Sequence, residues 1–117
     1  MPFKIIRNDI TKMKTDAIVN AANTKLQQGG GVCGAIFSAA GAQELQDECD
    51  RLGPCSVGQA VITSGHKLPS KHIIHAVGPI WQGGDHKEAD LLSSAYTSSL
   101  NLALKHNIKS IAFPLIS

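Results

Sequence analysis

Residues 16–41 read DAIVNAANTKLQQGGGVCGAIFSAAG, and this stretch decides the fold. Three successive apolar residues at 17–19 predict a strand that is covered on both faces, as in a sheet between helices. The polar stretch Asn20 to Gln28 and the three glycines at 29–31 then predict a loop with unusual backbone freedom. Apolar residues recur at helical spacing after the glycines, so a helix follows the loop directly.

The rest of the chain repeats this alternation of strands and helices. Further strands are expected at Phe3 to Arg7, Gln59 to Thr63, Lys71 to Val77 and Ser110 to Ile116. Further helices are expected around Leu45 to Leu52, set off by Gly41 and Gly53-Pro54, and from Glu88 to His106. This order predicts an α/β fold with a mixed, mostly parallel sheet, and such sheets bind ligands outside the carboxyl ends of their strands.

Composition limits the classes of protein that fit. The 117 residues suffice for one domain spanning 1–117, with 43% hydrophobic and 17% charged residues. The longest apolar runs fall far short of the roughly 18 residues that span a bilayer. Met1-Pro2-Phe3-Lys4 lacks the pattern of a secretory signal, which favours a cytoplasmic location. A net charge of +2 names no nucleic-acid partner.

Cysteine and histidine spacing gives no metal or disulfide motif. Cys33, Cys49 and Cys55 are odd in number and form no C-x-x-C, so a reducing compartment fits best. His72 and His75 lie three apart in a predicted strand and therefore point to opposite faces, which excludes a metal-binding pair. No metal and no cofactor are expected.

Residues 29–34 formally match G-x-G-x-x-G at the start of a helix, where unpaired N–H groups favour an anion such as phosphate. The match to a dinucleotide-binding fingerprint fails, because residues 21–28 separate the strand from the first glycine and no acidic residue follows at a strand end. No Gly-Lys-Ser/Thr ending occurs either, which excludes a Walker-type nucleotide hydrolase.

Several motifs in succession carry a resemblance to a known family. They are Asn8-Asp9-Ile10-Thr11, residues 16–23, residues 29–36 with Ala39-Ala40-Gly41, Gly58 to Thr63, His75 to Pro79 with Trp81, and Ala112 to Ser117. Together they strongly resemble the macrodomain family of ADP-ribose-binding modules, over essentially the whole chain. The resemblance implies a three-layer α/β/α fold, ADP-ribose binding, and hydrolysis of ADP-ribosyl conjugates or O-acetyl-ADP-ribose in the intact protein.

The resemblance also implies which residues bind ADP-ribose. Asp9 matches the residue that accepts a hydrogen bond from the adenine amino group, and the N–H of Ile10 matches a contact to the ring. Asn23 matches the asparagine beside the distal ribose, and the amides of residues 30–33 match the loop that holds ribose and diphosphate. The expected binding set is Asp9, Ile10, Asn20, Ala21, Asn23, Gly30, Gly31, Val32, Cys33 and Ser117, with Asn23 and Cys33 as candidate catalytic residues.

Two features depart from the family pattern. Hydrolytic members often have Asp where this chain has Cys33, and a neutral thiol cannot replace a carboxylate as base, although a helix N-terminus would favour a thiolate. Family members also continue past the Ile-Ser at 116–117 into a second glycine-containing loop, a helix and a strand that lies beside Phe3 to Arg7. We therefore expect weaker ADP-ribose binding than in a longer chain, exposed strand edges, and a homo-oligomer that pairs through those edges.

Other interpretations of the same residues stay open. Asp9 can cap the next segment, Asn20 can hold the loop, and the three glycines can form a flexible connector. Cys49 and Cys55 are expected to be small buried hydrophobic residues, and His75, Trp81 and Tyr96 are expected in the core or at its edge. The alternative functions are an ADP-ribose reader without turnover and, against the low charge and 4% aromatic content, an RNA-associated module.

Overall fold

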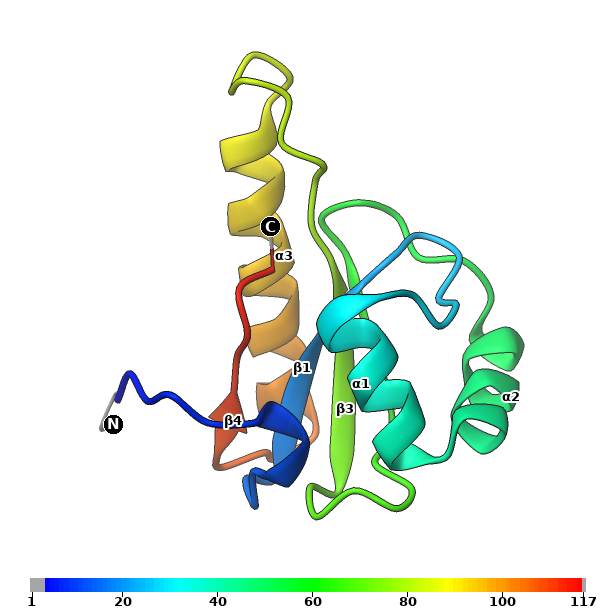
Figure 1. The fold of residues 1–117 in the computed structure, drawn as a ribbon. Coiled ribbons are helices and arrows are strands. Elements are labelled where there is room, and N and C mark those ends of the chain that lie inside the picture. Colours follow the sequence, from blue (N-terminus) through cyan, green and yellow to red (C-terminus); the bar gives the residue numbers. More distant parts are fainter. Residues whose placement is uncertain (1–3, 117) are drawn as a thin grey trace.

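The structure is a computed structural model that describes residues 4–116. Its strands are β1 Ala17–Ala22, β2 Ala60–Ser64, β3 His72–Val77 and β4 Ile111–Ala112. Its helices are the 3-10 turn η1 Ile10–Lys12 and the α-helices α1 Gly31–Ala40, α2 Ala42–Leu52 and α3 Glu88–Lys105. The sheet has the order β2-β3-β1-β4, with β1 parallel to β3 and β4, and β2 antiparallel to β3 (Figure 1). The predicted mixed, mostly parallel sheet is thus confirmed.

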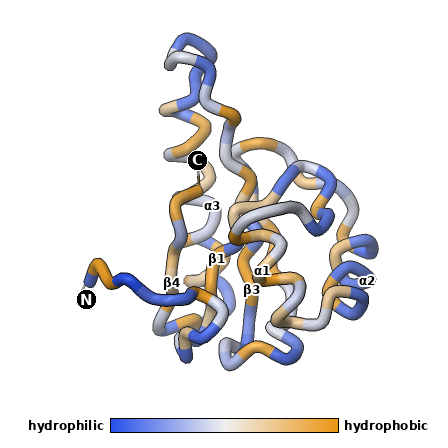
Figure 2. Tube along the Cα trace, viewed as in Figure 1, coloured by the Kyte–Doolittle hydropathy of each residue, from blue (hydrophilic) through white to orange (hydrophobic). Residues whose placement is uncertain are grey.

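Two buried clusters separate the sheet from helices on its two faces. Ile18 and Ile73 pack with α1 and α2, whereas Val19 and Ile74 pack with α3. All four side chains are completely buried, so the uninterrupted apolar run in β1 does mark a strand covered on both faces. Burial of each side chain contributes ~1.5–3 kcal/mol of transfer free energy. Figure 2 shows the hydrophobic residues following β1, β3 and α1, as the predicted three-layer α/β/α fold requires.

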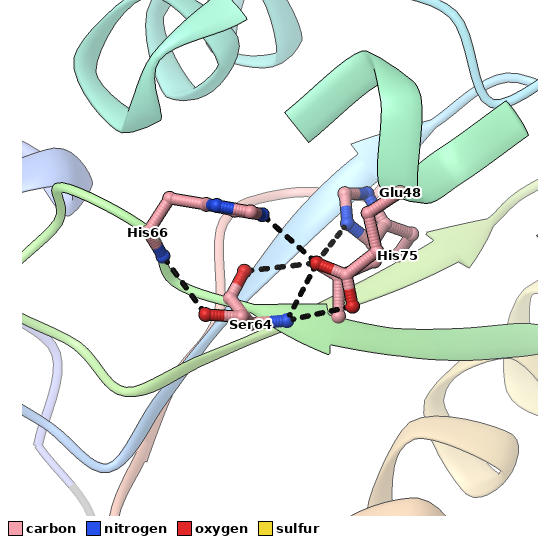
Figure 3. A network of polar contacts seen from close by, with 5 residues as sticks. Glu48, Ser64, His66 and His75 are labelled. Atoms are coloured by element: carbon pink, nitrogen blue, oxygen red, sulfur yellow. Dashed lines mark hydrogen bonds and ion pairs between the residues drawn. The ribbon is translucent and has the colours of Figure 1, made fainter. Parts of the chain in front are cut away.

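α2 lies between two glycines and is hydrogen-bonded to the end of β2 through Glu48. Gly41 separates α1 from α2 because it adopts a φ of 103°, which L side chains rarely adopt. In the second half of α2, the Glu48 carboxylate accepts hydrogen bonds from the Ser64 N–H at 3.2 Å and from His66 Nε2 at 2.8 Å (Figure 3). These contacts tie α2 to the end of β2, and the predicted helix boundaries at Gly41 and Gly53 are confirmed.

The strands predicted at the two ends of the chain differ from the structure, whereas the predicted strand at Gln59 to Thr63 is found as β2. Residues 4–7 form no strand, and Ile5 is 90% exposed, while Phe3 lies outside the described residues. No strand in residues 4–116 lies beside them, so an extended backbone there would gain no ladder hydrogen bonds. The predicted strand Ser110 to Ile116 is reduced to β4, because only Ile111 and Ala112 pair with β1 and Pro114 has no N–H to donate.

Trp81 is 54% exposed, so its predicted place in the core is wrong. The loop that carries it folds around Glu88 instead, whose carboxylate accepts from the backbone N–H groups of Gln82 and Gly84, each at 2.8 Å, and of His86. Burial opposes ionisation of this carboxylate, but the backbone donors outweigh burial and hold the pKa of Glu88 below its ordinary value. The other two predictions hold, since His75 is completely buried and Tyr96 packs against Phe113.

Both outer edges of the sheet lack a strand partner within residues 4–116, since β2 and β4 end the strand order. Ile6 and Leu115 add exposed apolar surface at 56% and 86%. The pairing of two copies through these edges stays a prediction, and we expect light scattering at high protein concentration to find a dimer. A monomer would contradict it. No helix within the described residues has both the length and the apolar character to cross a membrane.

Candidate functional site

The three glycines at 29–31, called the glycine loop below, pack on the first turn of α1, beyond the carboxyl end of β1. A Cβ atom on Gly34 would lie 2.4 Å from the carbonyl oxygen of Gly29, closer than any two such atoms pack. Gln28 holds the same region together, because its side-chain amide donates to the Gly34 carbonyl at 3.3 Å. The three glycines are therefore not only a flexible connector, since the loop packs closely against the first turn of the helix.

No side chain among residues 4–116 caps the N-terminus of α1. Gly30 is the N-cap residue, and the helix begins with the hydrogen bond from the Gly34 N–H to the Gly30 carbonyl at 3.2 Å. The first-turn amides of a helix have no intrahelical partner and carry the positive end of the helix dipole. The amides of residues 31–33 can therefore bind an anion, as the sequence predicted for this position.

The loop between β1 and the glycines is folded by its own contacts. Asn23 donates from Nδ2 to the Gln27 carbonyl at 2.7 Å, and its Oδ1 accepts from the Gln27 N–H at 3.0 Å. Leu26 adopts a φ of 53° and places its side chain in the cluster under α1 and α2, where it is 1% exposed. One N–H and one lone pair of the Asn23 amide remain free for a ligand.

Asp9 lies on the same face of the sheet as the glycine loop. It caps η1, with Oδ1 accepting from the Thr11 N–H at 2.9 Å and from the Thr11 hydroxyl at 2.7 Å. The Thr11 hydroxyl is the main cause that holds the pKa of Asp9 below its ordinary value, so the exposed carboxylate is ionised at neutral pH. η1 lies against α1, and Ile10 packs into the cluster on this side, opposite α3 (Figure 1). The capping interpretation of Asp9 is confirmed, and Oδ2 remains available.

Asn20 and Cys33 meet beneath the loop. Asn20 is completely buried and donates from Nδ2 to Cys33 Sγ at 3.6 Å, while the thiol, 7% exposed, points to the Gln27 carbonyl at 3.7 Å. Ala21 is partly buried in β1, and Val32 is 40% exposed at the surface of the first turn. Ser117, the last residue of the expected binding set, lies outside the described residues.

Other features of the described residues do not add to this site. Hollows of about 300 and 260 Å³ are lined by Glu48, Ile62, Thr63, Ser64, Lys71, His72 and His106, and by Gln59, Ala60, Ser98, Asn101, Leu102 and Lys105, none of which is in the expected binding set. Cys49 and Cys55 are buried, as predicted, and burial raises the pKa of Cys49 to about 11. His72 and His75 do point to opposite faces, toward His106 and Phe37 respectively.

No chemical role was expected for Gln27 or His75 from the sequence, and both contact residues of the expected site. The Gln27 carbonyl accepts hydrogen bonds from Asn23 Nδ2 and Cys33 Sγ, and a backbone acceptor cannot be recognised from a pattern of side chains. For His75 a signal did exist, because Asn20 and His75 each follow a run of apolar strand residues. In the parallel pairing of β1 with β3 they are direct neighbours, which places two polar side chains together inside an apolar sheet.

Known proteins with similar sequences are macro domain proteins. A family model described as Macro domain matches residues 19–117. A macro domain-containing protein of Mesorhizobium japonicum is 60% identical over 115 residues, which are 98% of this chain and 65% of the relative. A protein of Citrobacter rodentium named O-acetyl-ADP-ribose deacetylase is 56% identical over 117 residues, 97% of this chain and 66% of the relative.

Solved structures agree with the sequence relatives. The Oceanobacillus iheyensis macrodomain with ADP superposes with a TM-score of 0.88 at 44% identity, covering 94% of this chain and 61% of that one. The Trypanosoma brucei macrodomain in complex with ADP gives 0.82 at 42% identity, covering 90% and 42%. The chain thus spans about two thirds or less of the length of these proteins.

Proposed function

This chain belongs to the macrodomain family, and we propose that it binds ADP-ribose across the face formed by η1, the glycine loop and the first turn of α1. One observation carries the proposal. The uncapped amides at the start of α1 and the ionised carboxylate of Asp9 lie on one face of the sheet, because η1, which Asp9 caps, packs against α1. A ligand with a diphosphate and an amino-bearing base complements both.

Each part of ADP-ribose has a partner in this arrangement. The diphosphate would lie on the amides of Gly31, Val32 and Cys33, which the helix dipole makes attractive to anions. The adenine amino group would donate to Asp9 Oδ2, the oxygen that Thr11 leaves free. The distal ribose would take the remaining N–H and lone pair of Asn23.

Calorimetric titration with ADP-ribose tests the proposal. We expect saturable heat with one site per chain, weaker binding to ADP, and weaker binding again to AMP, since each loses contacts to Asn23 or to the α1 amides. The affinity is expected to lie below that of a chain extended through the second glycine loop of its relatives. Absence of any heat with ADP-ribose under conditions where the protein is folded would reject the function.

Asp9→Asn is expected to lower ADP-ribose affinity about tenfold (~1.4 kcal/mol) without unfolding the protein. Asparagine can still accept from Thr11 through its oxygen, but its NH₂ then faces the adenine amino group with donor against donor. Asp90→Asn, on exposed α3, removes the same charge away from the site and serves as the matched control. An equal loss in both variants would show that net charge, and not the adenine contact, is responsible.

We propose hydrolysis of O-acetyl-ADP-ribose or of ADP-ribosyl conjugates as the activity of the whole protein, by analogy with the named deacetylase of 56% identity. A reader without turnover is the second candidate, and the surroundings of Cys33 favour it. The thiol is 7% exposed and donates to the Gln27 carbonyl, and a thiol bonded in this way does not act as a general base. Turnover would then depend on the substrate's own phosphate, with Asn23 orienting the ribose.

Cys33→Asp separates these two candidates. A carboxylate at this position can act as general base, which is worth about 10²-fold or more in rate, so we expect a clear rise in hydrolysis of O-acetyl-ADP-ribose. Cys33→Asn has the same shape without the charge and should show no rise. Product release followed by chromatography measures both. If neither the wild type nor Cys33→Asp turns over substrate, the protein is a reader.

A further inference from the structure

A chain of buried polar side chains crosses the apolar sheet behind the glycine loop. It runs from β2 through β3 and β1 to α1, and every member is between 0% and 7% exposed. Its members are Thr63, His75, Asn20 and Cys33. Polar groups are costly in such surroundings unless they are hydrogen-bonded, and apolar side chains of the same size would fill this space at lower cost. Their presence therefore calls for a role other than stability.

The hydrogen bonds of this chain have one consistent direction. The Thr63 hydroxyl donates to the Ser64 carbonyl at 3.1 Å, so its oxygen is free to accept from His75 Nε2 at 3.0 Å. Asn20 Nδ2 donates to His75 Nδ1 at 3.1 Å, which requires that this nitrogen carry no proton. His75 is therefore the neutral Nε2–H tautomer, held between an acceptor on one side and a donor on the other.

Asn20 passes this orientation to the glycine loop. Its Nδ2 also donates to Cys33 Sγ at 3.6 Å, and the thiol donates to the Gln27 carbonyl at 3.7 Å. The same carbonyl accepts from Asn23 Nδ2 at 2.7 Å. The chain thus ends on the asparagine expected to hold the distal ribose and on a residue of the first turn of α1.

The cost of this arrangement is visible at one atom. Asn20 Oδ1 is buried and has no hydrogen-bond partner within residues 4–116. The Nδ2 group contacts both His75 Nδ1 and Cys33 Sγ, so the amide of Asn20 is held from its nitrogen side alone.

We propose that His75 is a positioning residue for ADP-ribose binding: it fixes the amide of Asn20, which holds Cys33 and, through the Gln27 carbonyl, sets the place of Asn23 and of the first turn of α1. The inference rests on the proposed function, since ADP-ribose is the ligand whose binding it explains. Burial lowers the pKa of His75 to about 4, so the ring is neutral under ordinary assay conditions, as the chain of donors requires.

The test compares two replacements of His75 by titration with ADP-ribose. His75→Asn places an amide oxygen near the position of Nδ1 and so keeps an acceptor for Asn20, whereas His75→Leu removes it. We expect His75→Leu to weaken binding about tenfold or more and His75→Asn to stay within about threefold of wild type. His72→Leu, on the opposite face of the same strand, should bind as the wild type does. Equal affinities of folded His75→Leu and wild type would overturn the inference.

Two further measurements keep the inference testable if His75→Leu does not fold. Thr63→Val keeps the volume of the side chain but removes the acceptor of Nε2–H, so ¹⁵N spectra should show the Nδ1–H tautomer appearing, together with weaker ADP-ribose binding. An unchanged tautomer and unchanged affinity would overturn the inference.

The double variant Thr63→Val with Cys33→Ala should lose no more affinity than the weaker-binding single variant, because both changes break one chain. Losses that multiply would show independent effects and would also overturn it. Failure of the wild type itself to bind ADP-ribose would instead reject the proposed function, and the inference with it.

Discussion

Gly34→Ala is expected to abolish measurable ADP-ribose binding, a loss of about 100-fold or more, and to destabilise the fold by about 3 kcal/mol. The added methyl group would lie 2.4 Å from the Gly29 carbonyl oxygen. That oxygen belongs to the backbone of the loop, so it cannot rotate away as a side chain would. The loop must leave the helix, and the amides of residues 30–33 then no longer face the ligand together.

The substitution by itself would stabilise α1, so the sign of the change in the free energy of unfolding is informative. Alanine is favoured over glycine inside a helix by about 1 kcal/mol, so a net loss can come only from the clash. Gly29→Ala is the matched control, because the same methyl group placed on the other partner has its nearest neighbours at ordinary van der Waals distances, Asn23 Nδ2 at 3.7 Å and Cys33 Sγ at 3.9 Å. Urea unfolding and calorimetric titration measure the two effects. Binding by Gly34→Ala within about threefold of wild type would show that the loop position is not needed.

The interior elements could be predicted because their signals are local. The run at 17–19 is apolar without interruption, and only a strand covered on both faces suits it. Gly41 and Gly53 limit α2 through backbone conformations that other residues avoid. Such features depend on a few neighbouring residues and survive any change elsewhere in the chain.

The strands at the two ends of the chain could not be predicted correctly, because a strand at an edge exists only if a partner lies beside it. Residues 4–7 have a strand-like pattern, yet in residues 4–116 nothing pairs with them. Trp81 fails for a related reason. Its large apolar surface favours burial, but the loop follows the hydrogen-bonding needs of the Glu88 carboxylate, which no apolar pattern records.

The sequence allowed residues of the candidate site to be proposed, but it did not indicate the contacts between them. Asp9 caps η1 before β1, and the glycines follow β1; both lie on the α1 face of the sheet because η1 packs against α1. The two hydrogen bonds of the Asn23 side chain go to backbone groups of Gln27. The contact of Asn20 with His75, 55 positions apart, depends on the register of β1 and β3. Register is a property of the whole sheet, so it can be obtained only from the structure.

The second large effect concerns acid. Burial lowers the pKa of His75 from 6.5 to about 4, and no charged group contributes to the shift. In the unfolded chain His75 takes up a proton as the pH falls below about 6.5, whereas in the folded chain it resists until about pH 4. Stability is therefore fully present above the unfolded pKa and is lost as the pH falls toward the folded one. The expected loss at about pH 4 is about 3 kcal/mol from this residue alone.

His75→Asn isolates this contribution, because asparagine does not titrate. Asp9 and Glu88 also have lowered pKa values, so their contributions to the free energy of unfolding decrease in acid. The decrease is the same in both proteins and cancels from the comparison. Urea unfolding at neutral pH and at about pH 4 should show wild type losing about 3 kcal/mol more than His75→Asn, while His72→Asn should follow wild type. Equal acid sensitivity of wild type and His75→Asn would mean that His75 is solvated in the folded protein.

The same protonation should disturb the loop before the protein unfolds. A proton on Nδ1 converts the acceptor of Asn20 into a donor, so two N–H groups face each other across a distance of 3.1 Å. Asn20 must then turn, and turning brings its unpaired Oδ1 toward His75 and withdraws Nδ2 from Cys33. Loss of stability and displacement of the first turn of α1 thus have one cause, and in His75→Asn both should disappear together.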